Sequence, residues 1–278
     1  MKKALKFSLF GLIASFAVTA CMPLFARKME TVDVSAASNL GTATGYTKAS
    51  DVDYVKSGNY VVNWGARDED CVFLTTYAQS FYTGSYTYET LSKTKGGTSA
   101  SEVEKSALFT SLRTLVKSKQ KSETSYGGTR DLYKYTDCVN SNYSYISSFY
   151  SGDRISGKWD SGATWNREHT WPNSKGDANG NGENDIMMLR PTSVSENSSR
   201  GNKAYGTGSS YYDPNGEAQN VRGDCARIIL YVYLRWRNLG AGGVWGSGGV
   251  MQSVDVLLDW MEEDPVDTWE MGRNDATQ

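Results

Sequence analysis

One ten-residue stretch, residues 165–174 (WNREHTWPNS), limits what the chain can build more than any other. It holds His169, the single histidine among 278 residues, directly after Glu168. Neighbouring side chains of a regular strand point to opposite faces, so these two can serve one site only where a strand ends or bends. Pro172 and the Asn-Ser-Lys-Gly turn after it are consistent with such an end. We therefore expect a strand that stops at this pair.

The pair also carries chemistry. A neutral imidazole can take a proton from water near neutral pH, and a carboxylate offers hard oxygen atoms to a divalent cation. A lone histidine among aromatic residues is, however, more often structural than catalytic. By itself the stretch leaves both interpretations open.

A second segment, residues 185–202 (DIMMLRPTSVSENSSRGN), favours catalysis. Together the two segments resemble the endonuclease I family of His-Me finger (ββα-metal) nucleases. In that family N-R-E-H-x-W-P-x-S is followed by D-x-H-x-L-R-P, by an asparagine six residues later, and then by R-G-N. The order and spacing match, although Met187 stands where the family often has histidine. The resemblance extends over residues 101–278.

The resemblance implies a role for each matching polar residue. His169 would be the general base, with Arg167 and Arg200 also assigned to catalysis. Glu168 and Asn197 would be the protein ligands of a divalent cation, Mg²⁺ or else Mn²⁺ or Ca²⁺. Substrate would be bound by four residues: Arg190, Arg200, Asn202 and Lys203.

These roles fit elementary metal chemistry. One carboxylate and one amide oxygen leave most positions around Mg²⁺ open to water and a phosphate oxygen. The histidine would deprotonate the water that attacks phosphorus. The predicted function is a metal-dependent endonuclease that cuts DNA with little sequence preference and leaves 5′-phosphate ends, with RNA kept open as a substrate. With a net charge of −2, the chain as a whole does not attract a nucleic acid electrostatically. A catalyst, however, needs only a local basic groove.

The N-terminus carries an export signal. A basic segment, residues 1–6 (MKKALK), precedes an apolar run over residues 7–20, as in a secretory signal peptide. Residues 18–21 (VTAC) resemble a lipobox, so Cys21 either carries lipid or is removed by ordinary cleavage near residue 20 or residues 36–37. Both interpretations predict a secreted or lipid-anchored protein outside the cytoplasm. Lipid would be the only membrane contact, and no protein partner is inferred.

The chain divides into four parts. We expect a signal peptide over 1–21, a flexible tether over 22–50, a small β-rich accessory region over 51–95 and a nuclease-like domain over 101–278. Apolar residues recur at helical spacing in 107–116, 226–236 and 254–261, whereas 126–150 is tyrosine-rich and predicted to be irregular. The predicted fold class is α+β: a His-Me finger core in a largely helical domain, with a small β-rich N-terminal region.

Several smaller expectations remain. Cys71 and Cys138 are the expected disulfide pair, with Cys225 a buried thiol, and Arg237 and Arg273 are expected to be solvated charges. One rival function is a non-catalytic cell-surface module on a nuclease scaffold, with residues 51–95 binding cell-wall glycan. Another is a calcium-dependent adhesion protein built on residues 177–185 (DANGNGEND), although the twelfth position of that loop is Met188 instead of glutamate.

Overall fold

The computed structural model describes residues 100–119, 123–139, 142–176, 182–214, 220–237 and 243–277, together with six short strands nearer the N-terminus. Three pairs form among these strands, β1 with β6, β2 with β5 in parallel, and β3 with β4. Their bounds are Thr31–Asp33, Tyr46–Lys48, Lys56–Ser57, Tyr60–Val61, Cys71–Phe73 and Ser85–Thr87 for β1 to β6. The predicted signal peptide, Cys21, most of the tether and accessory region, and residues 177–181 lie outside the described residues.

Seven helices and five strands make up the part of the chain from residue 100 onward that the structure describes. The helices are α3 (Ala100–Lys105), α4 (Ala107–Lys119), α5 (Tyr126–Thr136), α6 (Val194–Arg200), α7 (Arg222–Arg235), α8 (Val254–Glu263) and α9 (Thr268–Thr277). The strands are β7 (Cys138–Val139), β8 (Asn142–Ser147), β9 (Arg154–Ser156), β10 (Trp165–His169) and β11 (Leu189–Ser193). None of the described helices is both long enough and apolar enough to cross a membrane.

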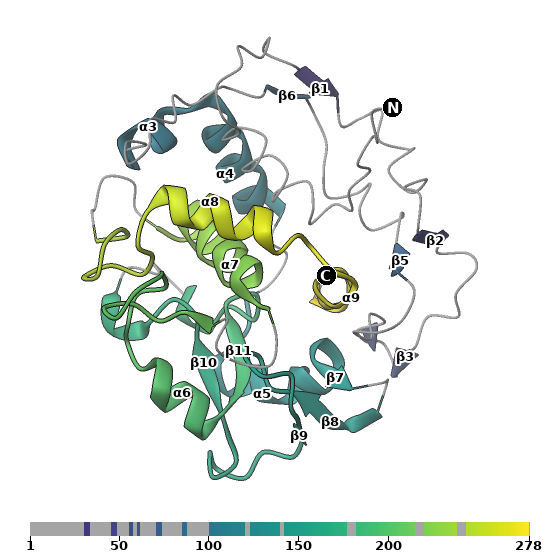
Figure 1. Cartoon of the computed structure of the whole chain (residues 1–278). Coiled ribbons are helices and arrows are strands. Elements are labelled where there is room, and N and C mark those ends of the chain that lie inside the picture. Colours follow the sequence, from purple (N-terminus) through teal and green to yellow (C-terminus); the bar gives the residue numbers. More distant parts are fainter. Residues whose placement is uncertain are drawn as a thin grey trace.

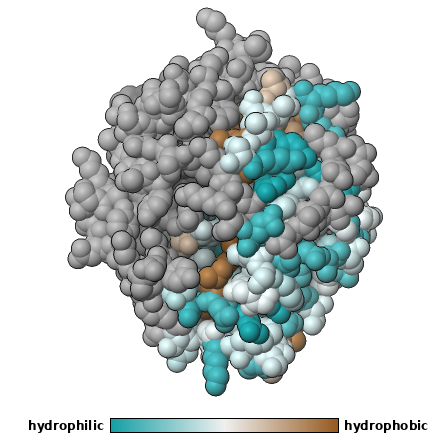
Figure 2. Space-filling model, turned by 180° about the vertical axis from the view of Figure 1, so that it is seen from behind, coloured by the Kyte–Doolittle hydropathy of each residue, from teal (hydrophilic) through white to brown (hydrophobic). Residues whose placement is uncertain are grey.

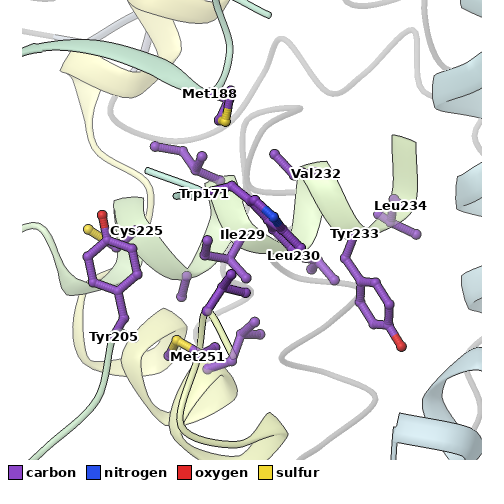
Figure 3. Packing of buried hydrophobic residues seen from close by; sticks show 14 of the residues in the cluster. Trp171, Met188, Tyr205, Cys225, Ile229, Leu230, Val232, Tyr233, Leu234 and Met251 are labelled. Carbon is purple, nitrogen blue, oxygen red and sulfur yellow. The ribbon is translucent and has the colours of Figure 1, made fainter. Parts of the chain in front are cut away.

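Helix α7 lies at the centre of the core. It packs against α8 and α4 (Figure 1), and nearly all of its side chains are buried. Its apolar residues pack in one cluster with Trp171 and Met188, which lie just after residue 169 and just before residue 189 (Figure 3). The predicted apolar stripes in α4, α7 and α8 are therefore confirmed as core-facing. On the face seen in Figure 2, most described residues are hydrophilic or intermediate, and apolar residues show only in small areas.

Two antiparallel strands and a short helix form the layer that carries the motif residues. Strand β10 pairs with β11, and α6 follows β11 directly and packs against both strands. Ser193 begins the helix with a capping box, because its hydroxyl accepts from the Glu196 N–H while the Glu196 carboxylate accepts from Ser193. A three-stranded sheet, β7-β8-β9, and α5 lie beside this layer (Figure 1).

Two expectations from the sequence are wrong. Residues 126–150 are not irregular, since they form α5, β7 and β8, and Ser125 caps α5 by accepting from the Gly128 N–H at 3.1 Å. Arg237 and Arg273 are not solvated, because they are 2% and 1% exposed. The partners that bury Arg273 lie far away in sequence, so local pattern could not reveal them, whereas the cap at Ser125 is a local signal.

Arg273 ties the C-terminal helix to the motif segment. Its Nε lies 3.0 Å from an Asp137 carboxylate oxygen, and its Nη2 donates to the carbonyl of Ile186 at 2.8 Å and to that of Leu189 at 3.2 Å. One buried guanidinium thus joins α9, the end of α5 and the start of β11. The expected Cys71–Cys138 bridge stays a prediction, because the side chain of Cys71 lies outside the described residues.

Replacing Arg273 by leucine should destabilise the fold strongly. The change leaves the buried Asp137 carboxylate short of a charge partner, and loss of one member of a buried pair typically costs about 3–5 kcal/mol. Urea unfolding followed by circular dichroism measures the loss. The matched control is Arg130→Leu, whose side chain is 41% exposed and whose surface ion pair is worth at most about 1 kcal/mol. Equal stability of the two variants would contradict the assignment.

Candidate active site

Strand β10 ends at His169, as expected from the sequence. Its last pairs with β11 are Glu168 with Arg190 and His169 with Leu189. Beyond Pro172 the chain turns through a short 3-10 helix, Asn173–Lys175, so no ladder continues. Glu168 and His169 therefore stand at the open end of a two-stranded sheet, with α6 packed against it.

Glu168 is buried, and one of its two carboxylate oxygens is engaged by neighbouring residues. It is 2% exposed, and its Oε1 accepts from the Tyr150 hydroxyl at 2.7 Å and lies 3.1 Å from Arg200 Nη1. No described residue donates a hydrogen bond to Oε2. This oxygen is not sealed from solvent. Burial raises the pKa of the carboxyl, against the effect of Arg200 and the Tyr150 hydrogen bond. One oxygen is held in place, and the other is left for a ligand.

The hydrogen bonds behind Glu168 run in one direction. The hydroxyls of Tyr150 and Tyr205 lie 2.6 Å apart, and Tyr150 spends its only proton on Glu168. Tyr205 must therefore donate to Tyr150. The guanidinium of Arg200 also lies 4.7 Å from the Tyr205 ring. Two buried tyrosines thus orient the carboxylate from behind.

Arg200 holds the end of the strand together. It is 1% exposed, and it donates to the carbonyl of His169 at 2.9 Å and to that of Thr170 at 2.7 Å while it pairs with Glu168. These contacts fix the backbone of His169 and Thr170 to α6. In this arrangement Arg200 faces the protein interior.

His169 has one ring nitrogen engaged. Its Nε2 lies 3.1 Å from the backbone carbonyl of Glu183. A carbonyl can only accept, so Nε2 carries the proton and Nδ1 keeps its lone pair. The ring stacks on Tyr126, with centroids 5.6 Å apart and planes at 22°. Burial lowers the pKa of His169 below its usual 6.5, which favours the neutral ring.

Asp185 fixes the turn that carries the Glu183 carbonyl. Its Oδ2 accepts from the Tyr231 hydroxyl at 2.7 Å and from Trp236 Nε1 at 2.8 Å, and its Oδ1 accepts from the Met187 N–H at 2.9 Å. The turn is thereby anchored to the end of α7. Asp185 acts on His169 through this turn and does not contact the ring itself.

The other two motif arginines lie in different surroundings. The guanidinium carbon of Arg167 lies 3.6 Å from the centre of the Tyr126 ring and 5.0 Å from that of Trp159. Arg190 is 4% exposed, 3.9 Å from Asp137, and burial lowers its pKa to about 10. Arg167 is thus part of a partly open aromatic cluster, whereas Arg190 lies in the interior.

Helix α6 and the turn after it carry the remaining predicted residues. Asn197 lies one turn before Arg200, so both project from the same side of α6, the side that meets Glu168. No described residue forms a hydrogen bond with the Asn197 side chain. Asn202 and Lys203 are exposed, and Lys203 Nζ donates to the Ser199 carbonyl at 3.3 Å. The structure therefore joins Glu168 and the His169 backbone through Arg200, with Asn197 one turn earlier on the same helix and Asn202 and Lys203 exposed after it.

Comparison with known proteins decides the family. The family model described as Endonuclease I matches residues 104–278, which is more than half of the chain. The chain belongs to the endonuclease I family. It is 37% identical over 132 residues to an extracellular ribonuclease of Bacillus amyloliquefaciens, covering 40% of this chain and 45% of the relative. It is 32% identical over 174 residues to an extracellular ribonuclease of Bacillus subtilis (strain 168), covering 54% and 60%.

The chain spans about half the length of these curated relatives. No solved structure matches the chain. For this member of the endonuclease I family, the site therefore has to be interpreted from its own geometry.

The donor set suits a hard cation held mostly by water. Among the described residues no group of three or more His, Cys, Asp or Glu side chains could hold a metal ion. The open oxygen of Glu168 and the unengaged amide of Asn197 offer two oxygen ligands on facing elements. Mg²⁺ accepts few protein ligands and keeps several waters, so this pair fits it.

Sequence reasoning missed the residues that support the endonuclease I motif. Tyr126 contacts His169 from 43 residues away, Tyr150 contacts Glu168 from 18 residues away, and Tyr205 contacts Arg200 from 5 residues away. With 18 tyrosines in the chain, no local signal separates these three from the rest. Asp185 could have been noted, because it is the first residue of the second motif.

The pKa of His169 can be measured directly, since the chain has one histidine and gives one imidazole titration by NMR. We expect a midpoint below 6.5, because burial disfavours the charged ring. Tyr126→Ala exposes the ring and should move the midpoint back toward 6.5, whereas Ser111→Ala, at an exposed position of α4, should leave it unchanged. A midpoint at or above 6.5 in the unmodified protein would refute the assigned environment.

Proposed function

We propose that the protein is an extracytoplasmic, metal-dependent endonuclease that hydrolyses phosphodiester bonds in DNA and RNA without sequence preference. The observation that carries this proposal is the pairing, at one strand end, of an imidazole with a free Nδ1 and a carboxylate with a free oxygen. Family membership and the names of the two relatives, both extracellular ribonucleases, support nucleic acid as the substrate and secretion as the destination. We assign β10, β11 and α6 to the ββα-metal core of a His-Me finger.

His169 acts as the general base. Its Nδ1 takes a proton from water, the water oxygen bonds to phosphorus, and the bond from phosphorus to the 3′ oxygen breaks. The leaving 3′ oxygen takes a proton from solvent, so the products are a 5′-phosphate and a 3′-hydroxyl. The hydrogen bond from Nε2 to the Glu183 carbonyl keeps the ring in the tautomer that this step needs.

Glu168 and Asn197 hold the cation, Mg²⁺ by preference and Mn²⁺ or Ca²⁺ as alternatives. When bound, such a cation neutralises charge that develops on the phosphate and on the leaving oxygen. Arg200 opposes the rise in the pKa of Glu168 that burial causes and anchors the backbone beside His169, so it positions the site from inside. Asn202 and Lys203, exposed after α6, are assigned to the phosphate backbone of the substrate. Arg190, a residue of β11, supports that strand from the interior through its pair with Asp137.

Removing the base tests the mechanism. His169→Ala should lower the rate of plasmid nicking and of RNA cleavage by about 10²- to 10⁴-fold, the usual contribution of a general base. For the unmodified protein, activity should fall as pH drops through the His169 pKa, below 6.5, because protonation removes the base. Ser111→Ala is the control for handling and folding. Full activity of a folded His169→Ala protein would eliminate the mechanism, and no cleavage by the unmodified protein with any of the three cations would favour a binding module.

Removing a metal ligand gives a second, separate test. Chelator should abolish cleavage, and Glu168→Gln and Asn197→Ala should each weaken Mn²⁺ binding, measured by calorimetry, by roughly tenfold or more. Asn197→Asp keeps an oxygen ligand and should retain binding. The matched control is Glu262→Gln, an exposed carboxylate on α8. Binding that is unchanged in Asn197→Ala would remove α6 from the metal site.

A further inference from the structure

Tyr126 is the one large hydrophobic residue that is exposed among those the structure describes, at 41%. It is the first residue of α5, and it stands directly beside the proposed general base. A side-chain carbon added at the neighbouring Gly127 would meet nothing within 4 Å, so the surface next to the ring is open. Single exposed aromatic residues are common, and the position of this one is what calls for an explanation.

One side of the Tyr126 ring is occupied by the site. The guanidinium of Arg167 lies 3.6 Å from the ring centre, and the His169 ring lies 5.6 Å away, tilted by 22°. Arg167 and His169 are two residues apart in β10, so they project from the same side of the strand. The guanidinium lies over one face of the ring, and 41% of Tyr126 is exposed; we call the face turned away from Arg167 the open face.

The ring is held firmly for a surface residue. The Tyr126 carbonyl accepts from Arg167 Nη1, and the same guanidinium also lies 5.0 Å from the Trp159 ring. Ser125 caps the helix on which Tyr126 stands. The ring is therefore a flat, preorganised aromatic surface with a positive charge behind it.

We propose that the open face of Tyr126 stacks on an unpaired base of the nucleotide next to the phosphate that His169 attacks. This inference rests on the proposed nuclease function and adds a substrate class to it. Aromatic stacking accepts every base, because every base has a π face, so the contact gives no sequence preference. In a duplex the bases already stack on one another, so a single-stranded segment should be the better substrate.

The test needs one defined cleavage point. We would use single-stranded oligonucleotides whose linkages are uncleavable methylphosphonates except for one phosphodiester, flanked on either side by a normal or an abasic nucleotide. For the unmodified protein and for Tyr126→Phe, loss of the stacked base should lower kcat/KM by about tenfold. For Tyr126→Leu, which keeps an apolar side chain without a π face, the normal substrate should already be slow, and removing the base should cost nothing further.

Two further arms separate the explanations. The preference for the single strand over the same strand in a duplex, in DNA and in RNA, should shrink in Tyr126→Leu and persist in Tyr126→Phe. Each substrate is compared between Tyr126→Leu and the unmodified protein. If the variant is slower by the same factor on the normal and on the abasic substrate, the ring acts only through His169 or the fold, and the stacking proposal is wrong. If the unmodified protein cuts no substrate, the nuclease proposal itself fails, whereas normal cleavage by Tyr126→Leu overturns the stacking alone.

Discussion

The buried pair between Glu168 and Arg200 is the contact on which the site depends. Their closest atoms are 3.1 Å apart, and both side chains are at most 2% exposed. Through this pair and two backbone carbonyls, a single guanidinium on α6 fixes the end of β10, where His169 begins the turn. The carboxylate, the imidazole and the helix that carries Asn197 are thereby kept in one fixed relation.

A pair of this kind is not retained for stability alone. Removing two charges from water costs several kcal/mol per ion, and apolar residues of similar volume often serve the fold equally well. The cost is partly offset here because Arg200 also donates to the carbonyls of His169 and Thr170, and Tyr150 donates to Glu168. What the pair adds is position, since it holds one carboxylate oxygen and leaves the other for a ligand. Arg273 serves the fold in the same way on the far side of β11, where it satisfies two carbonyls and Asp137.

Local pattern in the sequence predicts some of this arrangement and fails on the rest for a physical reason. The end of β10 could be predicted, because neighbouring strand residues diverge and Pro172 interrupts a ladder, and apolar spacing predicted the core faces of α4, α7 and α8. The buried arginines at 237 and 273 could not be predicted. They are surrounded by groups far away in sequence, Asp137 and two carbonyls for Arg273 and the Trp171 ring for Arg237. The cap at Ser125, by contrast, is a local signal that could have predicted the helical start at Tyr126. The family motif located the candidate residues, but it could not show that Arg190 and Arg200 face the interior.

Burial shifts the pKa values of His169 and Glu168 in opposite directions, and the consequences for chemistry are also opposite. It lowers the pKa of His169, which keeps the imidazole neutral and able to accept a proton. It raises the pKa of Glu168, which by itself would favour an uncharged carboxyl that is a poor metal ligand. Arg200 and the Tyr150 hydroxyl act against that shift, so the effect of burial on Glu168 is opposed by the same residues that hold it in place. The burial that favours a neutral His169 also disfavours a charged Glu168, and Arg200 offsets this second effect. The proposed reaction needs both the burial and the arginine.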